Sequence, residues 1–314
     1  MNIAQGRERL EAIAGSISKV LVGKKDVTER VLIALLCGGH VLIEDVPGVG
    51  KTLLVTALAK SLGCSFARVQ FTPDTLPTDI TGFTLFDLQT GRQETRPGAI
   101  FAQIVLADEI NRTSPKTQSA LLEAMQEGQV SIEGQSHALP SPFMVLATQN
   151  PVELTGTYPL PEAQLDRFLL RVKMGYPSRN EEIEILAGEP RAELLREIKP
   201  VAGAEDVLAL QALVGSVTRS PAILSYVVSI AEATRRHEMI SLGVSPRGSL
   251  ALLHASAARA LIRGRDYVTP DDVIDLAEDA LAHRLILSPQ ASFQNLGAGA
   301  IVKEIVRSLR VPIL

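Results

Sequence analysis

The sequence predicts an α/β protein with a parallel sheet, followed by a second domain made of helices. Three short apolar runs, at residues 41–43, 104–107 and 143–147, each end in polar residues. Uninterrupted apolar runs of this length are typical of strands buried on both faces of a parallel sheet. Segments with helical spacing separate these runs, and the last third of the chain shows only helical patterns. We therefore expect an α/β domain over residues 1–190 and an all-helical domain over residues 200–314.

The composition limits the classes of function. The chain has 314 residues, of which 46% are hydrophobic and 21% charged, as expected for a globular protein with a sizeable core. Aromatic residues make up only 4%, Trp is absent, and the formal net charge is -4. Neither an aromatic platform for single-stranded nucleic acid nor a strongly basic nucleic-acid surface is therefore expected.

The expected location is the cytoplasm. No apolar run reaches the ~18 residues of a membrane-spanning helix, and the N-terminal residues lack the apolar core of a signal peptide. Cys37 and Cys64 are the only cysteines, and their apolar surroundings favour buried thiols over a disulfide. The five histidines lack metal-ligand spacing, so we expect them to be structural or surface residues.

Two helices should precede the first strand. Apolar residues at helical spacing predict one over residues 3–20 and another over residues 26–37. The pair Gly38-Gly39 ends the second helix.

Residues 41–52 predict a buried strand, a glycine-bearing loop and the first turn of a helix. The tripeptide Gly50-Lys51-Thr52 matches the end of the phosphate-loop pattern G-x-x-x-x-G-K-[ST]. Gly48 and Gly50 allow backbone N–H groups to turn inward around a polyphosphate. Lys51 supplies a mobile positive charge, and the Thr52 hydroxyl can bind Mg²⁺. Asp45 replaces the first glycine of the pattern, so an accidental glycine–lysine turn is the alternative interpretation.

A long irregular segment follows the strand expected over residues 65–70. Between residues 71 and 101, glycines and prolines interrupt the pattern, while two strand-like stretches flank Thr90-Gly91. These features predict a hairpin within an inserted functional element; a plain connecting loop is the alternative.

Two acids end the next apolar run. Asp108 and Glu109 should lie at the carboxyl end of a buried strand, where open α/β sheets bind ligands. Asp108 would hold a metal ion directly or through water, and Glu109 would orient and deprotonate an attacking water. An acidic turn without catalytic function is the alternative.

Three further elements follow in the predicted first domain. Ser114-Pro115 begins a helix that ends at Gly128, and a hairpin is expected over residues 130–139. The strand over residues 143–149 ends at Asn150, which could hydrogen-bond the attacking water or the γ-phosphate. A strand-ending Asn before Pro151, without such a function, is the alternative.

Arg167 follows, between two apolar anchors in a short helical segment at residues 161–168. A last strand is expected over residues 169–172 and a helix from Ser178 to about residue 186. The helices expected afterwards span residues 204–214, 221–238, 246–263 and 270–285.

Arg247 falls in the first turn of the third of these helices. A cation is unfavourable there because of the helix dipole, which indicates a nearby anion. An ordinary surface arginine is the alternative.

The order of these features resembles an AAA+ ATPase module, and the match is closest to the MoxR family. The resemblance extends over about residues 6–287. Four strings carry it: Leu-Ile-Glu-Asp-Val-Pro-Gly-Val-Gly-Lys-Thr, Leu-Ala-Asp-Glu-Ile-Asn-Arg-Thr-Ser-Pro-Lys-Thr-Gln-Ser-Ala-Leu-Leu-Glu-Ala-Met-Gln-Glu, Ala-Thr-Gln-Asn-Pro and Leu-Pro-Glu-Ala-Gln-Leu-Asp-Arg-Phe.

The resemblance implies a P-loop NTPase αβα sandwich with a five-stranded parallel sheet and a C-terminal helical lid. Residues 71–101 would be the helix-2 insert and residues 130–139 the pre-sensor-1 hairpin. ATP or ADP with Mg²⁺ is the implied cofactor, and Thr52 and Asp108 are the implied metal ligands. The implied nucleotide-binding residues are Val22, Gly23, Pro47, Gly48, Val49, Gly50, Lys51, Thr52 and Leu53.

The resemblance also assigns catalytic roles. Lys51 and Thr52 match Walker A, and Asp108 and Glu109 match Walker B. The remaining assignments are Asn150 as sensor 1, Arg167 as an arginine finger acting on a neighbouring subunit, and Arg247 as sensor 2. We expect Asp108, Glu109, Asn150 and Arg247 to converge on the phosphate loop.

An arginine finger implies a ring of identical subunits, a hexamer in the expected case. MoxR-like ATPases are similar to chaperones that mature or activate client proteins. They often work with a partner bearing a von Willebrand factor A domain, and sometimes in metal insertion.

Two other functions stay open at this point. One is a nucleotide-controlled assembly or binding module with slow, incidental hydrolysis, which would not need the water-activating Glu109. The other is a DNA-remodelling motor, against which the acidic net charge and scarce aromatic residues count.

Overall fold

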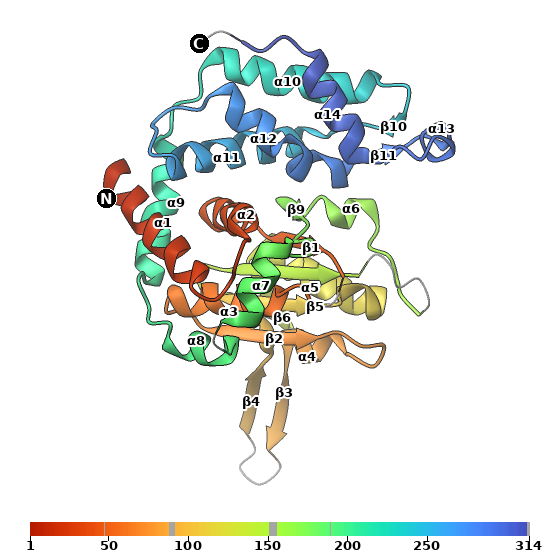
Figure 1. Ribbon diagram of the computed structural model, residues 1–314. Helices are drawn as coiled ribbons and strands as arrows, with labels where there is room; N and C mark the ends of the chain where they lie inside the picture. The colour runs from red at the N-terminus through yellow and green to blue at the C-terminus, as the bar shows by residue number, and fades with distance from the viewer. Residues whose placement is uncertain (47, 88–91, 151–155, 189, 313–314) are drawn as a thin grey trace.

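A five-stranded parallel sheet forms the centre of the molecule in the computed structural model (Figure 1). The structure describes residues 1–46, 48–87, 92–150, 156–188 and 190–312. The strand order is β2-β5-β8-β1-β9, and every neighbouring pair is parallel, which confirms the prediction. The strands are β1 (Val41–Glu44), β2 (Phe66–Gln70), β5 (Ile104–Asp108), β8 (Met144–Gln149) and β9 (Leu170–Val172).

Each face of the sheet packs on its own apolar cluster. Val41 and Ile43 of β1 belong to one cluster and Leu42 to the other, because alternate side chains of a strand point to opposite faces. The first cluster includes α1 (Ile3–Ser18), α2 (Lys25–Leu36) and α3 (Lys51–Ser61). The second includes α5 (Pro115–Glu127). The result is the three-layered αβα sandwich that the sequence predicts.

The insert after β2 contains a hairpin that projects from the body of the molecule (Figure 1). Its strands are β3 (Gly82–Asp87) and β4 (Arg92–Pro97), which pair antiparallel. The predicted hairpin is thus confirmed, although Thr90-Gly91 lies outside the described residues. The short helix α4 (Pro77–Thr81), which we did not predict, precedes it, followed after β4 by the 3-10 turn η1 (Ala99–Phe101). A second predicted hairpin is also present, with β6 (Gln129–Ile132) and β7 (Gln135–Ala138).

The C-terminal part is built of helices, which lie at the end of the molecule opposite the β3–β4 hairpin (Figure 1). The prediction of helices alone misses one detail, the short antiparallel pair β10 (Ile240–Leu242) and β11 (Ile286–Leu287). The helices are α9 (Ala204–Ser216), α10 (Pro221–Arg236), α11 (Pro246–Ile262), α12 (Pro270–Leu281), α13 (Pro289–Phe293) and α14 (Ala298–Ser308). The helix α6 (Glu162–Leu165) lies between β8 and β9, and α7 (Arg179–Ala187) and α8 (Arg191–Glu197) lie between β9 and α9. The remaining 3-10 turns are η2 (Ile110–Arg112) and η3 (Ala282–Arg284).

The C-terminal helices share one apolar cluster with the N-terminal helices and one face of the sheet. Ion pairs reinforce this contact: Arg30 of α2 lies 2.8 Å from Asp275 and 2.9 Å from Asp279, both on α12. The domain limits at residues 190 and 200 stay predictions. Across the described ranges, no helix has both the length and the apolar character needed to cross a membrane.

Candidate functional site

The predicted phosphate loop lies where the sequence placed it, between β1 and α3. Gly48 has φ +85° and Gly50 has φ +97°, a left-handed region in which side chains are strained. Gly50 is the residue that caps the start of α3, so the first N–H groups of that helix face the loop. Such a helix start is suited to an anion. Pro47 lies outside the described residues.

The Lys51 ammonium group folds back over the loop. Its Nζ donates to the carbonyl oxygens of Asp45, at 2.9 Å, and Val46, at 3.3 Å. Both partners are neutral, and none of the described bonds joins Lys51 to a carboxylate. The positive charge is therefore available to a polyphosphate. Thr52 and Leu53 follow in the first turn of α3, and both are half-buried, as is Val49 in the loop.

Asp45 ties the loop to a neighbouring segment. One carboxylate oxygen accepts from the N–H of Val46, and the other accepts from the N–H of Gly175. Asp45 is absent from the residues with positive φ in the described chain, so its backbone does not require the glycine of the usual pattern. The aspartate therefore works as an anchor of the loop.

Residues 21–24, which include the Val22 and Gly23 predicted to line the adenine, lie beside the loop. A side chain at Gly50 would contact Leu21 and Met174. The buried Lys24 donates to the carbonyl oxygens of residues 174–176, at 2.8 to 3.0 Å. Val22 is half-buried and Gly23 is exposed, with φ +72°. Any side chain at Gly23 would overlap Glu181, whose pKa is lowered by hydrogen bonds from Ser178.

The two acids lie at the carboxyl end of β5, as predicted. Asp108 is 8% exposed; Thr148 donates its hydroxyl to Oδ1 at 2.6 Å, and Arg68 lies 2.7 Å from Oδ2. Thr148 also accepts from the N–H of Glu109, at 2.8 Å, so one hydroxyl fixes both acids. Glu109 has φ +59°, an uncommon conformation for a residue with a side chain.

The carboxylate of Glu109 has two neighbours that the sequence did not reveal. Gln70 donates its amide to Oε2 at 2.8 Å, and the guanidinium Nε of Arg112 lies 3.1 Å from the same oxygen. Gln70 ends β2, which pairs with β5 in the register Gln70↔Asp108. A polar residue at the end of an expected strand was the available signal, but only the strand order brings it to the acids.

Asn150 follows β8, between the phosphate loop and the acids. It is 6% exposed, and β8 pairs with β1 on one side and β5 on the other. The backbone N–H of Asp45 donates to the carbonyl oxygen of Gln149, at 3.2 Å. The three strand ends thus bring Lys51, Asn150 and the acids to one edge of the sheet.

Arg167 and Arg247 lie at the opposite end of the sheet, where its strands begin. Both line a hollow of about 260 Å³ that also contains Gly38, Gly39 and His40, the residues just before β1. The phosphate loop lies at the other end of β1, whose four residues span about 13 Å at ~3.3 Å per residue. The expectation that Arg247 converges on the phosphate loop of its own chain is therefore wrong. The cause is the docking of the C-terminal helices on the amino end of the sheet.

Asp166 organises this hollow, which we call the arginine edge: residues Asp166, Arg167, Arg247 and Arg284. The carboxylate of Asp166 lies 2.6 Å from Nε of Arg284 and 3.9 Å from Nε of Arg247. Arg284 is 8% exposed, whereas half of the Arg247 side chain is exposed. Burial, with a smaller contribution from Arg219, lowers the pKa of the nearby His254, so arginines supply the positive charge of the hollow at neutral pH.

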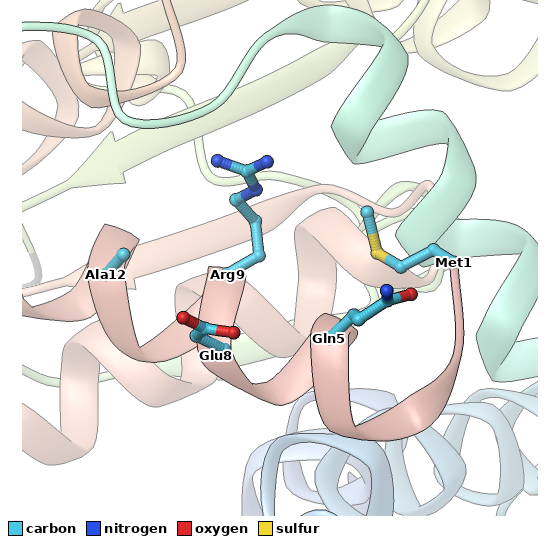
Figure 2. A pocket seen from close by; sticks show the side chains of 5 residues that line it. All are labelled: Met1, Gln5, Glu8, Arg9 and Ala12. Atoms are coloured by element: carbon cyan, nitrogen blue, oxygen red, sulfur yellow. The ribbon is translucent and has the colours of Figure 1, made fainter.

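A larger hollow, of about 430 Å³, lies along α1 and contains none of the predicted site residues (Figure 2). Met1, Gln5, Glu8, Arg9 and Ala12 line it. Arg9 donates to the carbonyl oxygen of Val201 at 2.9 Å, which ties α1 to the segment before α9. We therefore interpret this hollow as a gap where α1 meets the segment before α9, and not as a ligand-binding site.

Two families match parts of the chain. Residues 40–170 match the ATPase family associated with various cellular activities (AAA), and residues 232–305 match the AAA lid domain. The chain is 54% identical to the uncharacterized protein YeaC of Bacillus subtilis, covering 95% of this chain and 93% of that protein. It is 43% identical to Chaperone MoxR1 of Mycobacterium tuberculosis, covering 96% of this chain and 82% of that protein.

Two further proteins are similar to this chain over most of its length. Protein MoxR of Paracoccus denitrificans is 32% identical, over 92% of this chain and 91% of its own. The crystal structure of a proposed ATPase from Cytophaga hutchinsonii superposes with a TM-score of 0.90 at 36% identity, covering 99% of this chain and 97% of that one.

Proposed function

Because the chain belongs to the MoxR family of AAA+ ATPases, we propose that it binds ATP with Mg²⁺ and hydrolyses it in an oligomeric ring to remodel client proteins. One observation carries the proposal: Lys51, the Asp108–Glu109 pair and Asn150 meet at one edge of the sheet. A phosphate loop alone supports binding, whereas a loop with two acids and a buried amide supports hydrolysis.

The residues present fit a magnesium nucleotide. The start of α3 and the Lys51 ammonium suit the phosphates, and the hydroxyl of Thr52 with the carboxylate of Asp108 forms an oxygen donor set that Mg²⁺ prefers. Mg²⁺ held by these residues would offset the negative charge of the phosphates. Val22 and Gly23 would line the adenine, next to the anchored segment at residues 174–176.

Glu109 would orient and deprotonate the attacking water, and Asn150 would hold that water or the γ-phosphate. The left-handed backbone conformation of Glu109 and the hydrogen bond from its N–H to the Thr148 hydroxyl fix the backbone position from which the carboxylate side chain extends. Before it can act as a base, the carboxylate must leave Gln70 and Arg112.

Arg167 and Arg247 would both act on the nucleotide of a neighbouring copy. Their position at the arginine edge supports this assignment, because the nucleotide edge of the same chain lies across the sheet. An arginine supplied from another subunit stabilises the charge that develops in phosphoryl transfer. The proposed assembly is a homo-oligomeric ring, a hexamer by resemblance to the family.

The proposed partners are client proteins and a protein with a von Willebrand factor A domain, and metal insertion is one form that such maturation takes. The name Chaperone MoxR1 of the Mycobacterium tuberculosis relative supports a chaperone-like function. The free thiols of Cys37 and Cys64 are compatible with the reducing cytoplasm.

A second candidate is a nucleotide-controlled assembly module with slow hydrolysis. The contacts of Glu109 with Gln70 and Arg112 favour it, because a restrained base would slow turnover. The two functions differ in whether client release needs hydrolysis or only ATP binding.

Glu109→Gln tests the proposal. We expect the variant to bind ATP as the wild type does and to lose at least about a hundredfold in turnover, because the amide cannot accept a proton. Phosphate release and binding of a fluorescent ATP analogue would be measured in parallel. Glu123→Gln, an exposed change of the same type on α5, is the matched control. Turnover in Glu109→Gln equal to the control would refute the assignment of the base.

A further inference from the structure

Both oxygens of the Asp108 carboxylate are engaged by protein groups. Oδ1 accepts from the Thr148 hydroxyl at 2.6 Å, and Oδ2 accepts from the Arg68 guanidinium at 2.7 Å. The side chain of Asp108 is only 11% exposed, whereas that of Arg68 is 47% exposed. The arginine therefore approaches the buried acid from the open side of the site.

Strand register places Arg68 there. β2 and β5 pair with Arg68 opposite Leu106 and Gln70 opposite Asp108. Side chains two residues apart on a strand share a face, so Arg68 and Gln70 lie together. Arg68 donates to Oε1 of Gln70 at 3.1 Å, while Gln70 donates to Glu109 at 2.8 Å.

An arginine and a magnesium ion compete at such a carboxylate. A metal or a metal-bound water at Oδ2 would lie within a few ångströms of the guanidinium, and two cations so close repel each other. An ion pair with a half-exposed arginine is weak enough to be exchanged. Arg68 can swing into solvent, whereas Asp108 cannot.

We propose that Arg68 is a positioning residue that neutralises Asp108 while the metal is absent and must release it when Mg²⁺ arrives. The inference rests on the proposed magnesium-nucleotide site. Arg68 raises the Mg²⁺ concentration that the site requires and keeps the metal-free site closed to stray divalent cations. Through Gln70, its release also loosens the contact that restrains Glu109.

The test measures metal binding directly in the full-length chain. ADP affinity, from a fluorescent analogue, would be recorded in EDTA and across a Mg²⁺ series, and bound Mn²⁺ would be counted by electron paramagnetic resonance. For Arg68→Gln we expect half-saturating Mg²⁺ to fall by up to about fivefold, which corresponds to the strength of a partly exposed ion pair. Nucleotide affinity in EDTA should stay within about twofold of wild type, since the phosphate loop is untouched.

Two variants control for charge and for fold. Arg68→Lys keeps the charge and should retain a Mg²⁺ requirement near that of wild type. Arg112→Gln removes a positive charge that lies beside Glu109 instead of Asp108. It should change the Mg²⁺ requirement less than Arg68→Gln does. An equal shift in Arg112→Gln would overturn the proposal, because net charge alone would then explain the result. If Arg68→Gln fails to fold, Arg68→Ala, which also removes the charge, replaces it and should show the same lower Mg²⁺ requirement.

The remaining outcomes separate this inference from the proposed function. If wild type binds nucleotide more tightly with Mg²⁺ and Arg68→Gln has the same requirement, only the inference is wrong. Weaker binding by Arg68→Gln in EDTA would instead show that Arg68 contacts the nucleotide. If wild type binds no nucleotide, the proposed function and the inference are both wrong.

Discussion

His40 shows how one buried side chain can join the layers of the core. It lies just before β1, where its Nδ1 accepts from the N–H of Val145 and its Nε2 lies 3.0 Å from the carbonyl oxygen of Met125. This pairing fixes the ring in its neutral form with the proton on Nε2. Burial lowers the pKa of His40 to about 4, so protonation favours the unfolded chain.

Stability should therefore fall in mild acid. The stabilisation is complete above the unfolded pKa of about 6.5 and is lost as the pH falls towards about 4, with a loss of roughly 2 kcal/mol at pH 5. Urea unfolding between pH 7.5 and 5 would measure this slope. In His40→Gln, whose amide can replace both hydrogen bonds, the slope should flatten, apart from the shares of His254 and His283, whose pKa values are also lowered by burial. His137→Gln on the β6–β7 hairpin is the control, and equal slopes in both variants would contradict the prediction.

At this scale, local patterns predict residues that one motif holds together. Gly50, Lys51 and Thr52 follow one another, so their placement needs only the strand–loop–helix context. Arg68 was missed because its partner lies 40 positions away, and no local pattern shows which strands are neighbours. Arg247 was misplaced for the same reason: its position depends on how the C-terminal helices dock.

Among the elements, α12 depends on a single buried acid. Asp272 is fully buried and accepts from Arg259 at 2.6 Å and from Arg265 at 2.7 Å. It also accepts from the N–H of Thr269, at 2.9 Å, so it closes the start of α12. The sequence pattern Thr269-x-x-Asp272 is typical of this capping contact, but no local pattern indicates the two arginines from α11 and the following turn.

Asp272→Ala should destabilise the protein by about 3–5 kcal/mol, because it removes the buried partner of both arginines and leaves Arg259 only its pairs with Asp275 and Glu29. Asp271→Ala changes the exposed neighbour in the same helical turn and should cost less than about 1 kcal/mol. Chemical denaturation of both variants checks the difference. Similar midpoints would mean that the ion pairs contribute little beyond their surface value.

The elements that were missed are mostly short. α4 has five residues and β11 has two, too few for a periodic signal. α14 is longer and carries its buried residues at helical spacing, yet it lies beyond the helices assigned from the sequence. Element type thus followed from periodicity, while short elements depended on contacts that form only in the folded chain.

For the whole molecule, the distribution of charged residues over two edges of the sheet matters most. Lys51 and Glu109 lie at the carboxyl end of the strands, which we call the nucleotide edge because it is the proposed ATP site, and Arg167 belongs to the arginine edge. Neither edge alone holds all the residues that the proposed hydrolysis requires. The docked C-terminal helices fix this division, because they hold Arg247 beside Arg167.

Mixing two inactive variants should therefore restore activity. A Lys51→Ala subunit still offers Arg167, and an Arg167→Ala subunit still offers an intact nucleotide edge, so mixed assemblies contain some complete sites. We expect up to about a quarter of wild-type phosphate release from an equal mixture, since about one interface in four combines the two intact edges. Lys51→Ala mixed with Glu109→Gln places both defects on the same edge and should stay inactive. Recovery in that control, or none in the first mixture, would contradict the division.

The separation of the two edges also bears on the symmetry of the proposed assembly. A two-fold dimer would need both edges within one surface that packs on its own copy, with each edge of one copy against the other edge of its partner. A ring needs the copies to join head to tail, by a rotation that closes instead of continuing as a filament. A closed circle has as many complete sites as copies, whereas an open row always leaves one nucleotide without its arginine. Closure is therefore a condition for equal sites, whatever the number of copies.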